Sequence, residues 1–518
     1  MEKALSLASD TKVFVMEDGA LAKVPAVFNE CFPGREAIII ADCNTWKAAG
    51  EQVFGNMQAA GITVSRFLIP DEHFHAEWPY VEMVEDQVKN SGAIAVAVGS
   101  GVINDLCKLS SHHLGQSYLC VPTAASVDGY SSFGASISYQ GLKQTFECPA
   151  PLAIVADASV IAAAPAKMTA AGYADLAAKI PCGAEWMIAD LFGTEPIVPD
   201  AWHVLQDVLD QVLSNPEAVA AGDKDAISDL FIGLTLSGIA MQIARSSRPA
   251  SCTDHLFSHY LDMTGHRFNG ELQSHGFQVA IGTLTMCAFF DEFLKMDLSG
   301  LDVEKCVAAW PTLEQEQQRA LDIFKDFVSP RLGYDSITVK YADADGVRGQ
   351  LTKVKEQWPE LKKKYRAQVY TFEKMQRMFR IVGAPADPAD IGLTREQLKA
   401  IVPFAQLMRY RINLLDLAKR GMFYDELVES VFSGEGAWSI KEITEYAEDQ
   451  QEFQLLAVAH HHHFDDMLRD VLFRTEEFFH SDAGSDGRIR HIQHQLRYHH
   501  RYRLAGVRTC PFHQRLHR

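Results

Sequence analysis

The sequence predicts an α/β N-terminal domain with a parallel sheet and crossover helices, followed by an all-helical C-terminal domain. Short runs of β-branched residues alternate with helical patterns from about residue 36 to 157. After about Pro165 this alternation gives way to helical spacing. A chain of 518 residues is also too long for one ordinary core. We therefore expect domains at 1–160 and 161–440, and an atypical tail at 441–518.

The N-terminal elements alternate regularly between strand and helix. Strands are predicted at 36–42, 63–69, 94–98, 118–121 and 152–156. Helices are predicted from residue 44 to about 60, at 79–89 and at 102–114. Strands that alternate with helices of this length are typical of a parallel sheet, because parallel strands need crossover connections.

The C-terminal elements all have helical spacing. They are predicted at 166–192, 200–214, 224–245, 254–263, 275–296, 303–328, 351–381 and 393–432. Pro181 should kink or break the first of them, since proline lacks the N–H that a helix interior requires. The tail has a different composition: from Gly487 to Arg518 there are eight arginines, six histidines and no acidic residue. We assign the tail no function and expect poor order there.

The composition favours a cytoplasmic protein that acts on something small. The net charge of −19 disfavours nucleic acid as the main partner. We expect no membrane span, because no apolar run reaches roughly 18 residues. The N-terminus MEKALSLASDTKVF lacks the pattern of a signal peptide. Ten scattered cysteines without a CxxC pair suit a reducing compartment.

Two turns rich in small residues are candidates for binding a nucleotide. Gly99-Ser100-Gly101 follows a strand and precedes a helix, as a phosphate-binding loop does, although a plain turn explains it equally well. The carboxylate of Asp42, which ends an earlier strand, could accept hydrogen bonds from both ribose hydroxyls and repel a 2′-phosphate. The hydroxyls of the segment 122–126 (PTAAS) could bind a nicotinamide amide or a pyrophosphate, but Ser and Thr are also ordinary turn residues.

One carboxylate and three histidines are candidates for a metal site. Asp175 lies on an apolar face and is costly to bury without a cation, which is either Lys179 one turn later or a metal. His255 and His259 share one helix face, and His275 opens the next helix. A carboxylate with two imidazoles suits zinc with an open coordination position, and nickel or iron would also be accepted. The competing histidine pairs are His73 with His75 and His112 with His113.

Taken together and in this order, these segments resemble the sn-glycerol-1-phosphate dehydrogenase family, within the group of iron-type alcohol dehydrogenases and dehydroquinate synthases. The resemblance covers roughly residues 10–430. It rests on AVGSGVINDLCK, VPTAASVDGYSS, PLAIVAD, GYADLAAK, SSRPASCTDHLFSH and QSHGFQVAIG. The chain departs from the family at Ser100, where a third glycine is common, and at 252–254 (Cys-Thr-Asp), where small residues and Glu are more frequent.

The resemblance implies a role for each matching residue. The cofactor would be contacted by Asp42, Gly99, Ser100, Gly101, Asp105, Thr123, Ser126 and Ser132. The metal ligands would be Asp175, His255 and His275. The substrate would be contacted by Asp128, Asp175 and His259, and the catalytic set would comprise Asp175, His255, His259 and His275.

The resemblance also implies an activity. The chain would be a metal-dependent, NAD(P)-linked dehydrogenase, with NAD expected and NADP possible, that interconverts sn-glycerol 1-phosphate and dihydroxyacetone phosphate. The metal, zinc by expectation, would polarise the C2 oxygen during hydride transfer, in a cleft between a Rossmann-like and a helical domain. The alternatives are a dehydrogenase of another polyol or polyol phosphate, a dehydroquinate-synthase-like cyclase, and a non-catalytic binding protein. We expect a polyol phosphate substrate, a homo-oligomer and a link to phospholipid metabolism.

Overall fold

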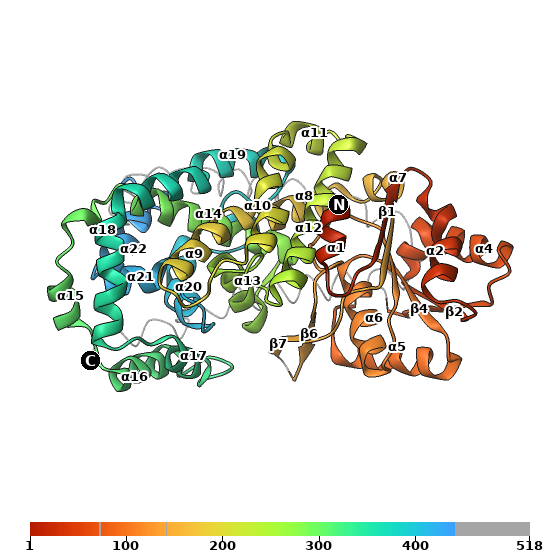
Figure 1. Cartoon of the computed structure of the whole chain (residues 1–518), viewed down its shortest axis with the longest axis horizontal. Coiled ribbons are helices and arrows are strands. Elements are labelled where there is room, and N and C mark those ends of the chain that lie inside the picture. The colour runs from red at the N-terminus through yellow and green to blue at the C-terminus, as the bar shows by residue number, and fades with distance from the viewer. Residues whose placement is uncertain (72–73, 141, 441–518) are drawn as a thin grey trace, which may run out of the picture. The chain divides into compact units, whose positions relative to one another are not determined.

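The computed structural model describes residues 1–71, 74–140 and 142–440. The predicted tail and the candidate ligand His73 therefore lie outside the described residues. Residues 1–440 form one compact unit by their contacts. Within this unit the sheet lies in the N-terminal part, and the rest of the unit is largely helical (Figure 1).

A six-stranded parallel sheet forms the N-terminal part, in the order β1-β8-β5-β4-β2-β3. Five strands match the predicted ones closely: β2 (Ala37–Ala41), β3 (Val64–Leu68), β4 (Ile94–Gly99), β5 (Leu119–Pro122) and β8 (Ala153–Asp157). The edge strand β1 (Val13–Glu17) was not predicted. It pairs with β8 from Val13–Ala153 to Glu17–Asp157, and its side chains are only partly buried, so its sequence carries a weaker strand pattern than the interior strands do.

Both faces of the sheet are covered by helices, which is why the central strands are apolar throughout. One core contains Ile39, Val96 and Val121 together with α2 (Val24–Cys31) and α4 (Glu51–Ala59). The opposite core contains Ile38 and Ala95 together with α5 (Trp78–Ser91) and α6 (Gly101–His113). The same core continues into the helical part. Helices therefore pack on both faces of the sheet, and the loops at the strand ends can carry functional residues.

Several helices depart from the predicted boundaries. The helix predicted at 166–192 is divided into α8 (Ala166–Ala177) and α9 (Lys179–Leu191). The division lies at Ala178, N-terminal to Pro181, because the proline ring removes the hydrogen bond to residue 177 and crowds that carbonyl. Other predicted helices are interrupted as well. These are 303–328, 351–381 and 393–432, which become α15 (Val303–Ala309) and α16 (Leu313–Phe324); α18 (Ala344–Gln368) and α19 (Phe372–Val382); and α20 (Arg395–Leu407), α21 (Leu414–Arg420) and α22 (Tyr424–Phe432).

The remaining elements complete the unit. The helices not yet mentioned are α1 (Glu2–Leu7), α3 (Cys43–Thr45), α7 (Ala158–Ala162), α10 (Pro199–Leu213), α11 (Pro216–Ala220), α12 (Lys224–Ala244), α13 (Thr253–Met263), α14 (His275–Phe293) and α17 (Leu332–Lys340). Two antiparallel hairpins were not predicted: β6 (Ala135–Tyr139) with β7 (Leu142–Phe146), and β9 (Arg267–Phe268) with β10 (Glu271–Leu272). The C-terminal part is therefore largely rather than entirely helical.

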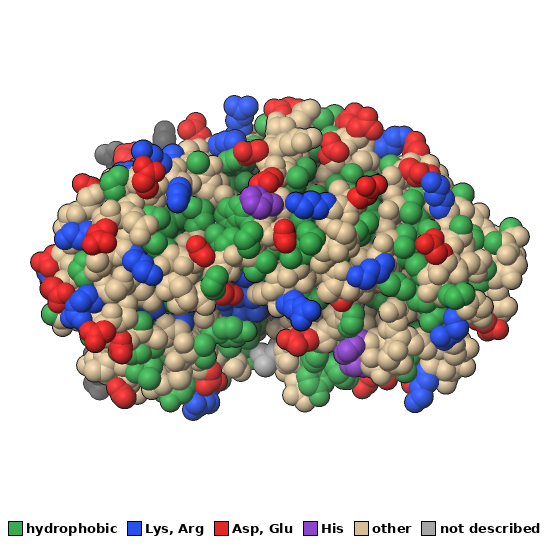
Figure 2. Space-filling model, in the orientation of Figure 1, with side chains coloured by type: hydrophobic (Ala, Val, Ile, Leu, Met, Phe, Trp, Pro, Cys, Tyr) green, Lys and Arg blue, Asp and Glu red, His purple; other side chains and the backbone are tan. Residues whose placement is uncertain are grey.

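Helix α12 is the one helix among the described residues whose length and composition would allow it to cross a membrane. Its most apolar window is 72% buried inside the unit, as expected for a core helix. On the face shown in Figure 2, acidic and basic side chains are interspersed.

Candidate functional site

The sheet has a topological switch point between β2 and β4. From β2 the chain continues to β3 on one side and then returns to β4 on the other. In open parallel sheets, ligands bind outside the carboxyl ends of the strands at such a point. Asp42 and Gly99 lie two residues beyond the paired Ile40 and Ala97, so the structure brings these two predicted cofactor residues to the same end of neighbouring strands.

The glycine turn is built for close packing. A Cβ on Gly99 would lie 2.6 Å from side-chain atoms of Ile103, and one on Gly101 would lie 2.9 Å from Val127. Ser100 is the N-cap residue of α6, yet its side chain makes no capping hydrogen bond. The first N–H groups of this 13-residue helix therefore remain available for an anion, which the helix dipole favours.

Asp42 also caps the short helix α3 that follows it. Its Oδ1 accepts hydrogen bonds from the N–H groups of Asn44 (2.7 Å) and Thr45 (3.0 Å), and the Thr45 hydroxyl accepts one from the Asp42 N–H. This is a capping box, which satisfies otherwise unpaired donors. Only Oδ1 is used in it, so Oδ2 remains for a ribose hydroxyl.

The other predicted cofactor residues support the loop that follows β5. Thr123 donates its N–H to the Gly99 carbonyl at 3.1 Å, which ties the two turns together. The hydroxyl of Ser126 lies 3.3 Å from that of Tyr130, and Ser132 donates its hydroxyl to the Gly129 carbonyl. Asp105 accepts from the N–H of Ser136 at the start of the β6–β7 hairpin. The structure therefore gives Ser126, Ser132 and Asp105 protein contacts, and their cofactor contacts stay a prediction.

Three glycines allow the helices of the candidate metal site to pack against one another with backbone contact. A Cβ on Gly172 of α8 would lie 2.0 Å from the carbonyl oxygen of Ala125. One on Gly276 of α14 would lie 2.2 Å from the carbonyl of Ala171, and one on Gly282 would lie 2.1 Å from the carbonyl of Asp254. No side chain fits these spaces, so α8, α13, α14 and the loop after β5 are held at fixed distances.

These helices bring Asp175, His255 and His275 together. One ligand atom from each lies within 4.8 Å of the other two, and this is the one such cluster found in the part of the chain that the structure describes. The Nε2 atom of His255 lies 3.4 Å from Oδ1 of Asp175. Of the competing histidines that the structure describes, His75 is exposed, and His113 pairs with Glu85 at the surface.

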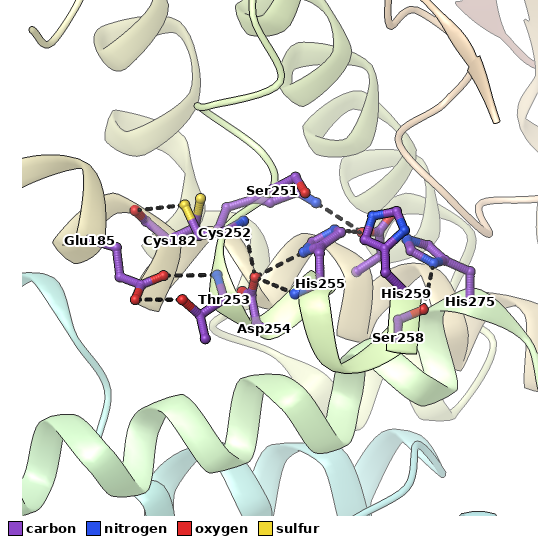
Figure 3. A network of polar contacts seen from close by, with 12 residues as sticks. Cys182, Glu185, Ser251, Cys252, Thr253, Asp254, His255, Ser258, His259 and His275 are labelled. Atoms are coloured by element: carbon purple, nitrogen blue, oxygen red, sulfur yellow. Dashed lines mark hydrogen bonds and ion pairs between the residues drawn. The ribbon is translucent and has the colours of Figure 1, made fainter. Parts of the chain in front are cut away.

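Hydrogen bonds behind the two imidazoles fix their tautomers (Figure 3). Nδ1 of His255 lies 2.9 Å from Oδ1 of Asp254, a carboxylate that can only accept. The Ser258 hydroxyl donates to Gln278 Oε1 at 2.6 Å, so it accepts from Nδ1 of His275 at 3.0 Å. Nδ1 of each ring is thereby engaged as a hydrogen-bond donor, so a metal would bind through Nε2, whose lone pair is free when that nitrogen carries no proton.

A buried lysine balances the carboxylates of the cluster. Nζ of Lys179 lies 2.8 Å from Asp175 and 3.0 Å from Asp128, and its side chain is fully buried. Burial alone would raise the pKa of the Asp175 carboxyl, but the Lys179 ammonium and the imidazoles outweigh it and hold that pKa well below its usual range. Asp128 also donates its N–H to Asp175 and accepts from Ser237. Asp128, predicted to contact substrate, thus lies beside the cluster.

His259 lies one helical turn beyond His255 and has a partner that the sequence did not indicate. Nη2 of Arg409 lies 3.4 Å from Nε2 of His259. Burial and the nearby Arg409 guanidinium hold the pKa of His259 well below its ordinary value, and burial lowers the pKa of His275 to about 4. Burial and the Lys179 ammonium oppose it, but the carboxylates of Asp254 and Asp175 raise the pKa of His255, so the pKa values of the three imidazoles are shifted in different directions within one region.

The residues present fit a divalent metal. The donor set is one ionised carboxylate and two imidazoles with free Nε2 lone pairs, which is the chemistry of catalytic zinc and is also acceptable to nickel or ferrous iron. Asp254 supplies the carboxylate behind a histidine ligand that metal sites commonly contain.

A glutamate behind Asp254 was also missed by sequence reasoning. Glu185 accepts hydrogen bonds from the N–H and hydroxyl of Thr253, at 2.9 and 2.8 Å, and from the N–H of Leu414 at 3.0 Å. Its bonds to Thr253 cap the first turn of α13 (Figure 3), and its bond to Leu414 caps that of α21. The one available signal was an acidic residue in an otherwise apolar helical pattern.

Comparison with known proteins agrees with this fold. The model of the family "Iron-containing alcohol dehydrogenase" matches residues 15–165. A glycerol-1-phosphate dehydrogenase [NAD(P)+] of Halalkalibacterium halodurans is 32% identical over 49% of this chain and 64% of that protein. One of Bacillus licheniformis is 30% identical over 57% of this chain and 74% of that protein. The crystal structure of a probable glycerol dehydrogenase from Sinorhizobium meliloti shares the fold, with a TM-score of 0.52 and 19% identity over 81% of this chain and 98% of that one.

A parallel sheet with a ligand-binding edge, followed by helices that carry an Asp/His/His cluster, defines an oxidoreductase of the iron-containing alcohol dehydrogenase class. Within that class, the chain belongs to the glycerol-1-phosphate dehydrogenase family. The family resemblance inferred from the sequence motifs is confirmed.

Proposed function

We propose that this protein interconverts sn-glycerol 1-phosphate and dihydroxyacetone phosphate, with NAD or NADP as hydride carrier and one bound divalent metal. The observation that carries the proposal is the convergence of Asp175, His255 and His275, each with a ligand atom within 4.8 Å of the others. The names of the relatives, which specify glycerol-1-phosphate and NAD(P)+, supply the substrate and the cofactor.

The protein's own residues would each perform a defined task. Asp175, His255 and His275 would hold the metal, which when bound polarises the C2 oxygen of the substrate as a Lewis acid. Asp128, which pairs with Lys179 and accepts from the Ser237 hydroxyl, would accept a hydrogen bond from a substrate hydroxyl. His259 accepts from Arg409 at Nε2, so its hydrogen is on Nδ1, where it would donate to a substrate oxygen.

The cofactor would bind along the carboxyl edge of the sheet. The uncapped N–H groups at the start of α6 would bind its pyrophosphate, and Oδ2 of Asp42 would accept from a ribose hydroxyl. Hydride transfer needs donor and acceptor close and aligned. The hydrogen bond from Thr123 to Gly99 supports that requirement, because it links the turn that would hold the cofactor to the loop that carries Asp128.

The synthase alternative finds less support in the cations of this chain. A cyclase of that type needs several free basic residues around its substrate. Lys108 instead donates to the carbonyls of Gly129, Ser132 and Gly134, and Arg248 donates to those of Glu185 and Ile412. Lys179 pairs with two carboxylates, so three of the five cations considered for this role are engaged inside the fold, the set being Lys108, Lys143, Lys179, Arg245 and Arg248.

The direct test is to supply the purified protein, loaded in turn with zinc, nickel or ferrous iron, with NADH and dihydroxyacetone phosphate. We expect net NADH loss and formation of sn-glycerol 1-phosphate, whereas a synthase would only recycle its cofactor. His275→Ala should abolish both bound metal and turnover while the circular dichroism spectrum stays the same. His203→Ala is the matched control, since His203 pairs with Asp207 at the surface. Metal content equal to wild type in His275→Ala would contradict the assignment.

A further inference from the structure

Arg409 is a partly enclosed cation next to the candidate active site. It follows α20 and lies 150 residues from His259 in sequence, yet its Nη2 is 3.4 Å from the His259 ring. Among residues 1–71, 74–140 and 142–440, no carboxylate forms an ion pair with Arg409. Its neighbour Arg411 differs, because it pairs with Glu195 and donates to Ser251 and Ser246.

This placement of the Arg409 side chain is energetically unfavourable in the protein without a ligand. Burial and then the nearby Arg411 lower the pKa of the Arg409 guanidinium to about 10. A guanidinium carries five N–H donors and no acceptor, and its only protein partner in the described part of the chain is the imidazole of His259, itself neutral. A partly enclosed cation that lacks a counter-charge favours binding an anion.

The position of Arg409 matches the size of a polyol phosphate. His259 follows His255 by one helical turn, so the two imidazoles are separated by about 6 Å along α13. Four single bonds of about 1.5 Å separate the C2 oxygen of glycerol 1-phosphate from its phosphorus, and they span roughly 5 Å when extended. A substrate whose C2 oxygen lies at the Asp175/His255/His275 cluster is therefore long enough for its phosphate to reach His259 and Arg409.

A second cation faces the same region. Lys143 of β7 lies 3.5 Å from Asp262 near the end of α13, and it contributes to lowering the pKa values of both His259 and His275. Because Asp262 already balances its charge, Lys143 is the weaker of the two anion-binding candidates.

We propose that Arg409, together with His259, binds the phosphate group of the substrate and so selects phosphorylated over unphosphorylated polyols and ketones. This inference rests on the proposed function and adds the residue that determines substrate class. Arginine suits the role because its planar fork can donate two parallel hydrogen bonds to phosphate oxygens. The residue lies far from the family motifs in sequence, which is why those motifs did not indicate it.

The test compares dihydroxyacetone phosphate with dihydroxyacetone as substrates of the metal-loaded enzyme with NADH. We expect the ratio of the two kcat/KM values to fall roughly 10- to 100-fold in Arg409→Gln, the effect of losing hydrogen bonds to a charged group. Arg409→Lys should lie in between, since it keeps the charge but loses the fork. Arg331→Gln, which removes an exposed arginine paired with Asp335, should leave the ratio at its wild-type value.

A binding measurement separates this proposal from the proposed function. Inorganic phosphate is titrated into the metal-loaded, NADH-bound protein by calorimetry, and Arg409→Gln should bind it more weakly than wild type. If wild type reduces dihydroxyacetone phosphate but Arg409→Gln keeps the wild-type substrate ratio, the role of Arg409 is refuted while the activity stands. If wild type does not reduce it, weaker phosphate binding by the variant still supports Arg409, and equal binding refutes it. Should Arg409→Gln fail to fold, Arg409→Lys decides by the same two measurements.

Discussion

Replacing Asp254 by asparagine tests whether a carboxylate behind His255 sets the metal affinity of the cluster. Oδ1 of Asp254 accepts from Nδ1 of His255 at 2.9 Å and from the N–H groups of His255 at 2.7 Å and Cys252 at 3.2 Å. Its Oδ2 is buried without a hydrogen-bond partner in the described structure. Asparagine can keep the amide oxygen at the first position and place its NH₂ at the second, so the fold is preserved and only the charge is lost.

The magnitude follows from that lost charge. A neutral amide makes the His255 ring a weaker base at Nε2, and outer-sphere changes of this kind typically cost 10- to 100-fold in metal affinity, or about 1.4–2.8 kcal/mol. The assay is a competitive titration of the metal-free proteins with zinc against a chelator of known affinity. The metal-free variant should unfold at nearly the wild-type temperature.

The matched control is Asp207→Asn, which changes an exposed Asp–His pair of the same kind, with 3.1 Å between Asp207 and Nδ1 of His203. It should leave zinc affinity unchanged. Wild-type affinity in Asp254→Asn, with the fold intact, would show that Asp254 does not tune His255 and would refute the reasoning from its hydrogen bonds.

Three further variants probe the fold and the cofactor edge. Gly172→Ala should lower stability by about 1–3 kcal/mol or more in thermal unfolding, because its Cβ would lie 2.0 Å from a backbone carbonyl. Its control is Gly349→Ala, which lies in open space on α18 and should instead raise stability by about 1 kcal/mol. Burial raises the pKa of Glu185 from 4.5 to about 7, so between these pH values the folded state holds a proton that the unfolded state has lost. The free energy of unfolding of the wild type should therefore fall by up to about 3 kcal/mol as the pH rises from 4.5 to 7. This loss should be absent in Glu185→Gln. Asp42→Ala should raise the NADP⁺/NAD⁺ ratio of kcat/KM values by removing the charge that repels a 2′-phosphate.

Each of these has an outcome that would contradict it. A Gly172→Ala protein as stable as wild type would mean that α8 does not touch the loop after β5. Parallel pH–stability curves for Glu185→Gln and wild type would show that the titration of Glu185 does not contribute to the pH dependence of stability. For Asp42→Ala, the control is Asp302→Ala, which also loses a helix cap; an unchanged cofactor ratio in Asp42→Ala would show that the carboxylate does not face the ribose.

The fold was largely predictable because most elements carry local signals. Interior strands such as β2 and β4 are continuous apolar runs between turn residues, and the structure places them within about one residue of the prediction. β1 was missed because its side chains are only partly buried, so the apolar contrast on which strand prediction depends is small. In β6 only Ala135 and Ile137 are fully buried, so its apolar signal is short.

The site was predictable only in part, because its geometry depends on contacts between distant segments. The spacing of His255 and His259 indicated one helix face. The apolar surroundings of Asp175 and the place of His275 at a helix start made both candidates, and the family resemblance then implied that they are ligands. Their convergence depends on how closely α8 and α14 can approach, which Gly276 decides and which no local pattern reveals. Arg409 could not be found at all by spacing, since its contact with His259 spans 150 residues.

The double cap made by Glu185 has a consequence for how the protein folds. Its hydrogen bond to the Leu414 N–H closes a loop of 229 residues, and its bonds to Thr253 fix the first turn of the helix that carries His255. Contacts between such distant residues form slowly, because the chain loses conformational entropy before the contacts contribute favourable energy. We therefore expect the metal-binding geometry to assemble late in refolding, so recovery of zinc binding after dilution from denaturant should report completion of the helical part as well as of the sheet.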